Sequence, residues 1–418
     1  MADSNKHTPL LRFPEFLNDE EWAMDSMESI FEIKNGYTPS KSNPDFWTDG
    51  TIPWFRMEDI RKNGHILSDS IQHITPGAVK SAGLFPAYSI IVATTATIGE
   101  HALIIVDSLA NQRFTFLTKR KSFDNRIDMV YFHYFMFIID EWCKQNTNAG
   151  GLLSVNMEAF KKLTIPYPAS LAEQQKIAEC FTSIDKQIEA TNSKLQQLKA
   201  HKRGLVQRLF PVRGKTTPEY RFPEFANNEE WQEVTLGDIT TVVNKRNKSK
   251  RNLPIFSINN VDGFVPQSQQ FEGMDSNARG YDTSSYKIVY KHTFAYNPAR
   301  INIGSIGYSG ELNDILISSL YVCFKTIDGV DDDFLMCFFN SYMFNQAVES
   351  NVEGGIRNYL FYENFSRIKL RLPALNEQRR IASCIISIDN IIKKTNVKIG
   401  FLESHLKGLQ QHLFTKIK

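Results

Sequence analysis

The sequence is poor in cysteine and has no cysteine-based metal motif. Its 418 residues include five cysteines, with no CxxC pair and no Cys/His ligand spacing. Scattered cysteines in an odd number argue against a disulfide framework and a zinc site, and they favour a reducing compartment. The five are Cys143, Cys180, Cys323, Cys337 and Cys384. We interpret two of them, Cys180 and Cys384, as small, buried apolar side chains.

Long apolar runs and an excess of one charge are also missing. The longest apolar run, residues 129–139, contains His133 and is too short to cross a bilayer. The first residues have no apolar segment typical of a secretory signal, so we expect a cytoplasmic protein. The chain has 48 basic and 46 acidic side chains, a net charge of +2. Total charge therefore does not indicate a polyanionic partner, and any such partner must be argued from local features.

What the sequence does contain is a long internal repeat. EQQKIAECFTSID begins at Glu173 and EQRRIASCIISID at Glu377, and residues 173–210 and 377–414 align without a gap and are identical at about half of their positions. Upstream of each copy stands RFPEF, at Arg12 and at Arg221, followed at the same offset by Glu-Glu-Trp. The chain is therefore a tandem duplication.

The segments between these repeats agree in pattern more than in letters. Alternating apolar residues predict a strand over 52–60 and over 253–261, and a strand with a following turn over 89–99 and 293–304. Apolar stretches beginning at Asp128 and Asp333 predict buried helices. A short strand ending in proline precedes each repeated stretch. Each half is thus predicted to be one mixed α/β domain followed by one long helix.

Each repeated stretch carries a heptad seam, with apolar residues spaced alternately four and three apart. Two matching seams in one chain, separated by a whole domain, favour antiparallel packing of the helices with pseudo-twofold symmetry; the alternative is that each helix packs on its own domain. Thr191, Thr395 and Lys202 interrupt the seam and either set its register or are tolerated imperfections. The seam residues are Ile177, Phe181, Ile184, Ile188, Leu195 and Leu198 in the first copy and Ile381, Ile385, Ile388, Ile392, Ile399 and Leu402 in the second.

A duplicated half with a divergent α/β domain and a well-matched helix resembles the specificity subunit of type I restriction-modification systems. The resemblance rests on RFPEF with the following Glu-Trp, on Asn35-Gly-Tyr-Thr-Pro-Ser followed by Phe46-Trp-x-x-Gly-x-Ile-Pro-Trp, and on the Glu-Gln-x-x-Ile-Ala that opens each helix. It implies two target-recognition domains, 1–168 and 218–373, with spacer helices in 169–217 and 374–418.

In this family each target-recognition domain reads one block of an asymmetric, bipartite double-stranded DNA sequence. The resemblance also implies that the helices dock methyltransferase subunits, that restriction/translocase subunits join the complex, and that S-adenosylmethionine, ATP and Mg²⁺ belong to those partners. The chain itself is then not an enzyme. The alternative is a coiled-coil adaptor that joins protein partners without reading DNA.

Candidate DNA contacts are cationic and amide side chains in loops of the two domains. The densest basic run follows Val243, where the second half lacks the NGYTPS of the first. It either contacts phosphates or is a solvated loop. The candidates are Lys34, Asn35, Tyr37, Thr38, Ser40, Lys41, Lys119, Arg120 and Lys121 in the first half, and Lys245, Arg246, Lys248, Lys250, Arg251, Arg300, Arg357 and Asn358 in the second.

Catalytic signatures are missing. Asn297-Pro-Ala-Arg partly matches the Asn-Pro-Pro-aromatic motif of adenine methyltransferases, but it lacks the second proline and the aromatic, and its counterpart in the first half is Thr94-Thr-Ala-Thr. Glu58-Asp59 corresponds to Asn259-Asn260, which could not serve as charged metal ligands. The nine histidines show no HExxH pattern. We therefore expect no catalytic site and no metal site.

Overall fold

The computed structural model describes residues 8–148, 153–212, 214–270, 273–351, 359–415 and 417. The chain divides into two compact units, one of Met1–Asn192 with Val397–Lys418 and the other of Ser193–Asn396. We call them unit 1 and unit 2. Each of the two long helices, α5 (Leu171–Leu209) and α11 (Leu375–Leu413), contributes a segment to both units.

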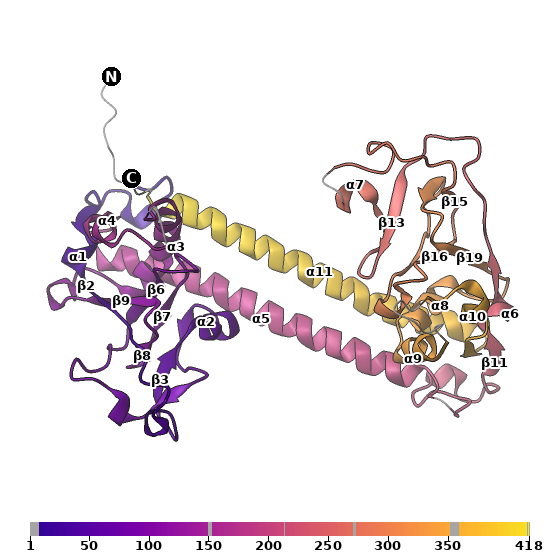
Figure 1. Ribbon diagram of the computed structural model, residues 1–418, viewed down its shortest axis with the longest axis horizontal. Coiled ribbons are helices and arrows are strands. Elements are labelled where there is room, and N and C mark those ends of the chain that lie inside the picture. Colours follow the sequence, from indigo (N-terminus) through magenta and orange to yellow (C-terminus); the bar gives the residue numbers. More distant parts are fainter. Residues whose placement is uncertain are drawn as a thin grey trace. The chain divides into compact units, whose positions relative to one another are not determined.

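Unit 1 is a mixed α/β domain built on two sheets (Figure 1). The larger sheet has the order β2 (Phe31–Asn35), β9 (Phe114–Lys119), β6 (Ser89–Ala93), β7 (His101–Ile104), β4 (Ile66–Leu67). The smaller has the order β5 (His73–Ile74), β3 (Ile52–Phe55), β8 (Leu109–Ala110), and in Figure 1 its strands β3 and β8 lie away from the α5 segment of this unit. β1 (Ala23–Ser26) and β10 (Thr164–Tyr167) form a separate antiparallel pair that joins the first and last strands of the domain. The helices are α1 (Met27–Ile30), α2 (Met57–Asn63), α3 (Met129–Gln145) and α4 (Met157–Lys162), with single 3-10 turns at Pro14–Phe16, Pro44–Phe46, Pro76–Ala78 and Lys121–Phe123.

Unit 2 repeats this plan. One sheet has the order β12 (Thr240–Val242), β19 (Val322–Thr326), β16 (Phe294–Tyr296), β17 (Ile306–Tyr308), and it corresponds to β2, β9, β6 and β7. The second has the order β14 (Gly263–Pro266), β13 (Ile255–Asn259), β18 (Ile315–Ile317), β15 (Lys287–Val289). The pair β11 (Gln232–Thr235) and β20 (Lys369–Leu372) matches β1 and β10. The helices are α6 (Leu236–Ile239), α7 (Gln267–Gln270), α8 (Asp332–Phe339), α9 (Tyr342–Asn351) and α10 (Tyr362–Ser366), with 3-10 turns at Pro223–Phe225 and Ile301–Ile303. The predicted mixed α/β class is confirmed in both halves.

One predicted element differs from that observed. The prediction of a strand over 52–60 is wrong beyond Phe55, because α2 begins at Met57. The buried Asp59 carboxylate explains the turn: it accepts hydrogen bonds from the backbone N–H groups of Arg56 and Ile71, both at 2.6 Å. In unit 2 the equivalent segment continues as the β13–β14 hairpin. The second buried helix, predicted to begin at Asp333, is confirmed as α8, and a separate helix, α9, follows it at Tyr342.

The long helices run antiparallel within each unit. In unit 1 the start of α5 packs against the end of α11, where Phe181 stacks on Phe414 with ring centroids 5.3 Å apart, beside Tyr131 and Phe135 of α3. In unit 2 the end of α5, with Leu209, joins the start of α11 in the core. Every predicted seam residue is buried or half-buried. Each helix therefore contacts its partner helix as well as the domains.

The interruptions in the seam have local partners. The hydroxyl groups of Thr191 and Thr395 donate to the carbonyls of Gln187 and Ile391 one turn earlier in their own helices. The Lys202 ammonium lies 2.6 Å from the Asp389 carboxylate within unit 2. These residues therefore place no unpaired polar group in the seam.

No helix in the described part of the chain is long and apolar enough to cross a membrane. All five cysteines are free thiols. Cys180 and Cys384, which were predicted to be buried, are only half-buried, whereas Cys143, Cys323 and Cys337 are buried. Burial raises the pKa of Cys143 to about 12, which suppresses its thiolate form.

Candidate nucleic-acid interface

The repeated sequence motifs build the same junction in both units. In unit 1 the Arg12 guanidinium donates from Nε and Nη2 to the two oxygens of Glu173, at 2.8 and 2.7 Å, and also to the carbonyls of Asp19 and Glu20. The Trp22 indole donates to Glu173 at 3.4 Å. The hydrogen bond to the buried carboxylate raises the pKa of Arg12.

Unit 2 repeats these contacts with Arg221, Glu377 and Trp231: the guanidinium–carboxylate bonds are 2.9 and 2.8 Å, and the indole bond is 3.2 Å. RFPEF and the Glu-Trp that follows it thus fix the chain entry to the start of the long helix. Their role in both units is structural.

The glutamine after each of these glutamates fixes the helix start to the domain. Gln174 accepts from the Asp128 N–H at 2.8 Å and donates to the carbonyls of Arg126 and Pro168. Gln378 makes the equivalent bonds to Asp331, Gly329 and Pro373. The Glu-Gln pair therefore fixes the start of the long helix to the domain in each unit, which explains why the chain contains it twice.

In unit 1 the predicted DNA-contact loop follows β2 and is held by its own side chains. Gly36 lies against the carbonyl of Ala110, where a Cβ would come within 2.3 Å of the oxygen, so only glycine fits. The Tyr37 hydroxyl donates to the Ala78 carbonyl at 3.3 Å, and its ring lies 4.4 Å from the Lys80 ammonium. The Thr38 hydroxyl donates to Gln112.

The remaining predicted residues of this loop and of the end of β2 are at the surface. Ser40 and Lys41 are exposed. The Lys34 ammonium lies 2.5 Å from Glu32, and Asn35 accepts a hydrogen bond from Thr115 at 2.9 Å. Lys41 is the cation of this group without a partner among the described residues.

In unit 2 the equivalent loop is residues 245–251, which we call the basic loop. Buried Asn247 organises it by donating to the Arg251 carbonyl and accepting from the Arg251 N–H, both at 2.9 Å. Its backbone pairs with the segment around β15 through Asn247 N–H to Tyr286 and Ile288 N–H to Lys245. Lys245, Arg246, Lys248, Lys250 and Arg251 are all exposed, and only Arg251 forms an ion pair within the described residues, with Asp314 at 3.2 Å. The loop is a fixed scaffold that presents cations to solvent.

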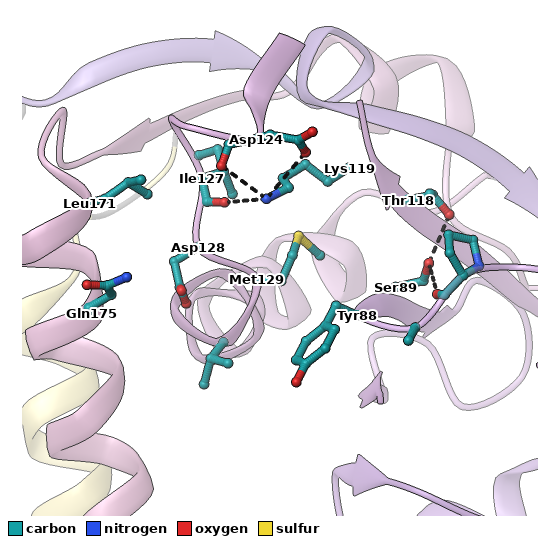
Figure 2. Close-up of a pocket in the computed structure, with 13 residues that line it drawn as sticks. Tyr88, Ser89, Thr118, Lys119, Asp124, Ile127, Asp128, Met129, Leu171 and Gln175 are labelled. Atoms are coloured by element: carbon teal, nitrogen blue, oxygen red, sulfur yellow. Dashed lines mark hydrogen bonds and ion pairs between the residues drawn. The ribbon is translucent and has the colours of Figure 1, made fainter. Parts of the chain in front are cut away.

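The other predicted residues are more dispersed. Figure 2 shows Lys119 in a cavity of about 390 Å³, where its ammonium donates to the Ile127 carbonyl at 2.9 Å and faces the Asp124 carboxylate at 3.7 Å. The Arg120 Nε donates to the Glu28 carbonyl, while Lys121 is exposed. Arg300 is exposed before the turn at Gly304. Arg357 and Asn358 lie outside the described residues.

The comparisons with known proteins agree on one family. The model of the type I restriction modification DNA specificity domain matches residues 19–200 and again 228–400. The chain belongs to this family. It is 30% identical to the EcoprrI type I specificity subunit of Escherichia coli, over 89% of this chain and 88% of that protein. It is 24% identical to the MjaVIII specificity subunit of Methanocaldococcus jannaschii, over 69% and 70% of the two chains.

Solved structures support the fold of a specificity subunit. The S subunit from M. genitalium superposes with a TM-score of 0.60 at 15% identity, over 98% of this chain and 100% of that one. A chain from a structural study of type I complex assembly gives 0.57 at 14% identity, over 94% and 96%. As a specificity subunit, the chain recognises DNA sequence and is the non-catalytic member of its system. The adaptor hypothesis is not favoured.

One polar cluster of this specificity subunit was missed by the sequence analysis. In unit 1 the His65 Nδ1 lies 2.6 Å from the His133 Nε2, and the His101 Nδ1 lies 3.0 Å from Asp140. The His65 Nε2 lies 3.4 Å from Asp185 of α5. Burial is the main cause that lowers the pKa of His65 and of His133. The three histidines are far apart in sequence and share no spacing, so no linear signal could find them.

The histidine cluster does not form a metal site. Within the part of the chain that the structure describes, no group of three or more histidine, cysteine or acidic residues is arranged to hold a metal ion. The cluster instead links β7, α3 and the start of α5 within unit 1.

Proposed function

We propose that each unit reads one short block of an asymmetric, bipartite double-stranded DNA target. The observation that carries this proposal is the same sheet framework built twice, with unlike loops at the same place. After β2 the loop of unit 1 leaves Lys41 as its unpaired cation, whereas after β12 the basic loop of unit 2 exposes five cations. Two equivalent sheet frameworks that carry different loops suit the recognition of two different blocks of bases. Cationic side chains that contact phosphates would fix the position of each unit along the duplex.

The long helices are proposed to separate the two reading units and to dock methyltransferase subunits, with restriction/translocase subunits completing the complex. Support comes from exposed helix positions that are identical in both copies although they make no core contact. They are Ser183 and Ser387, Lys194 and Lys398, His201 and His405, and Gln207 and Gln411. Identical exposed side chains on two helices suit two equivalent partners.

We further propose that S-adenosylmethionine, ATP and Mg²⁺ are bound by those partner subunits and that the complex works in the cytoplasm. The free thiols are compatible with a reducing compartment.

The test is selection from a pool of randomised duplexes, using the purified chain together with its methyltransferase subunits. We expect two enriched blocks at a fixed separation, with centres about one helical turn apart. Enrichment of one block only would contradict reading by both units. No enrichment would contradict DNA reading altogether and restore the adaptor hypothesis.

A further inference from the structure

The turn between β8 and β9 in unit 1 has the same backbone as the turn between β18 and β19 in unit 2. In unit 1 the Phe114 N–H donates to the Asn111 carbonyl at 3.1 Å, and the Arg113 N–H donates to the Asn111 side chain at 3.0 Å. In unit 2 the Tyr321 N–H donates to the Ser318 carbonyl at 3.2 Å, and the Leu320 N–H donates to the Ser318 hydroxyl at 3.4 Å. Asn111 and Ser318 therefore play one role, and Arg113 and Leu320 occupy equivalent positions.

The strands on both sides of this turn confirm the equivalence. Before the turn, β8 pairs in parallel with β3, and β18 pairs in parallel with β13. After it, β9 pairs with β2 and β6, and β19 pairs with β12 and β16. The two copies therefore share the backbone of the turn and the strand pairing on both sides of it.

The side chains at the tip have diverged, and neither supports its own unit. The Arg113 side chain is exposed and makes no hydrogen bond or ion pair within the described residues. Leu320 is 77% exposed and belongs to none of the hydrophobic clusters of the described residues. A single exposed leucine is ordinary on a protein surface. What distinguishes Leu320 is its position, because it replaces an unpartnered arginine on an otherwise conserved turn.

The tip is attached to the predicted DNA-contact loop in each unit. In unit 1 the Thr38 hydroxyl donates to Gln112, next to Arg113. In unit 2 the Lys287 ammonium donates to the Tyr321 carbonyl at 2.6 Å, next to Leu320, and Lys287 forms a β-bridge with Arg246 of the basic loop. A side chain presented beside a phosphate-binding loop is well placed to enter a groove of the bound duplex.

We propose that Arg113 and Leu320 are base-reading residues of the two units. Arginine recognises guanine through paired hydrogen bonds to O6 and N7 in the major groove, while an apolar side chain contacts the C5-methyl group of thymine. Arg113 then reads a guanine in the block of unit 1, and Leu320 reads a thymine in the block of unit 2. This inference rests on the proposed function and deepens it, because it assigns a base chemistry to each unit.

The first experiment repeats the duplex selection with the full complex carrying Arg113→Ala or Leu320→Ala. Arg113→Ala should lower the preference for guanine at one position of one block by about tenfold to a hundredfold. The other block and the spacing should not change. Leu320→Ala should relax a thymine preference in the other block only. Lys144→Ala, which removes an exposed cation paired with Glu141, and Ile327→Ala, which trims an exposed apolar residue at the far end of β19, are the controls.

A second measurement tests the methyl contact without changing the protein fold. Replacing the read thymine by deoxyuridine should weaken binding of the unaltered complex by about fourfold, which corresponds to loss of one buried methyl group. The same replacement should have no effect on the Leu320→Ala complex. The Leu320→Arg variant should shift the preference at this position from thymine to guanine.

The outcomes separate this inference from the proposed function. If the unaltered complex selects no blocks, the proposed function fails. If it selects two blocks that the variants leave unchanged, or if Arg113→Ala weakens binding equally for all sequences, only the base-reading role is overturned.

Discussion

At the residue scale, the invariant feature of the two halves is a buried ion pair that joins the chain entry to the long helix. The Glu173 side chain is 1% exposed and that of Arg12 is 9% exposed. Such a pair gains little over an apolar contact, but the loss of one partner is costly, because a charge then stays buried without compensation. The carbonyl contacts of the guanidinium explain why both halves have arginine rather than lysine, since lysine lacks the planar fork of donors.

We therefore expect Arg12→Ala to destabilise unit 1 by about 3–5 kcal/mol. The Arg221→Ala variant should affect unit 2 in the same way, because its pair has the same geometry. Urea unfolding followed by separate fluorescence signals of the units measures both. The control is Lys176→Ala, which removes a half-exposed pair with Glu15 and should cost less than about 1 kcal/mol. Equal losses of unfolding free energy in Lys176→Ala and Arg12→Ala would contradict the stabilising role of the buried ion pair.

The histidine cluster makes the stability of unit 1 depend on pH. Burial lowers the pKa of His133 and His65 in the folded state, so the unfolded chain binds more protons below the ordinary histidine pKa. Stability is then fully present above that value and is lost as the pH falls. Asp185 opposes the shift at His65, and His101 reinforces it. Asp140, whose pKa is raised by burial, has the opposite pH dependence.

The expected result is a loss of unit 1 stability when the pH is lowered from about 7.5 to about 5. Thermal unfolding across this range measures it. His133→Phe should flatten the dependence, whereas His201→Ala on the exposed helix surface should leave the slope unchanged. A slope that is the same with and without His133 would show that the cluster does not control it.

At the element scale, periodicity predicted the elements that bury one face. The heptad seams predicted α5 and α11, and the prolines at 168 and 373 marked the boundary before each helix. The strand predicted at Ile52 failed after Phe55, because Asp59 closes the turn with backbone groups twelve and three residues away. A contact of that kind is set by tertiary structure and leaves no periodic signal.

The candidate site was predictable only in part for the same reason. Charge density identified the basic loop, and the structure places its five cations at the surface. The turn tips at Arg113 and Leu320 were not found, because their equivalence appears only when hydrogen bonds and strand pairing are compared. Lys119 and Arg120 were selected on charge, yet backbone carbonyls hold them.

Replacing the cations of the basic loop tests the loop as an element. Alanine at Lys245, Arg246, Lys248, Lys250 and Arg251 should weaken DNA binding and reduce the slope of log K against log salt by about 0.9 for each phosphate that the loop no longer neutralises. Binding measured at several salt concentrations checks this. The control is Lys369→Ala on β20, whose ammonium pairs with Glu233. An unchanged slope would show that the loop does not bind phosphates.

At the scale of the whole molecule, the two copies share the contacts that stabilise each unit and differ in the loops that each unit exposes. The junctions around Glu173 and Glu377 agree bond for bond, whereas the loops after β2 and β12 share little sequence. This division suits the proposed function, in which one partner surface is kept twice and two unlike DNA blocks are read. The proposed function then predicts that the spacing of the blocks depends on the paired helices rather than on the loops.

A charge placed in the helix seam tests that dependence. Ile184 and Ile388 occupy the same seam position in the two copies, and Ile184 is 8% exposed. Ile388 is half-buried. A carboxylate at either position would lie in the apolar seam without a partner, so Ile184→Asp combined with Ile388→Asp should disrupt helix pairing. Duplex selection should then lose the fixed separation of the blocks, while each block alone is still enriched. The matched control, Ala190→Asp on the exposed face of α5, should preserve both blocks and spacing. Fixed spacing that survives the double substitution would mean that the helix seam does not set the distance between the readers.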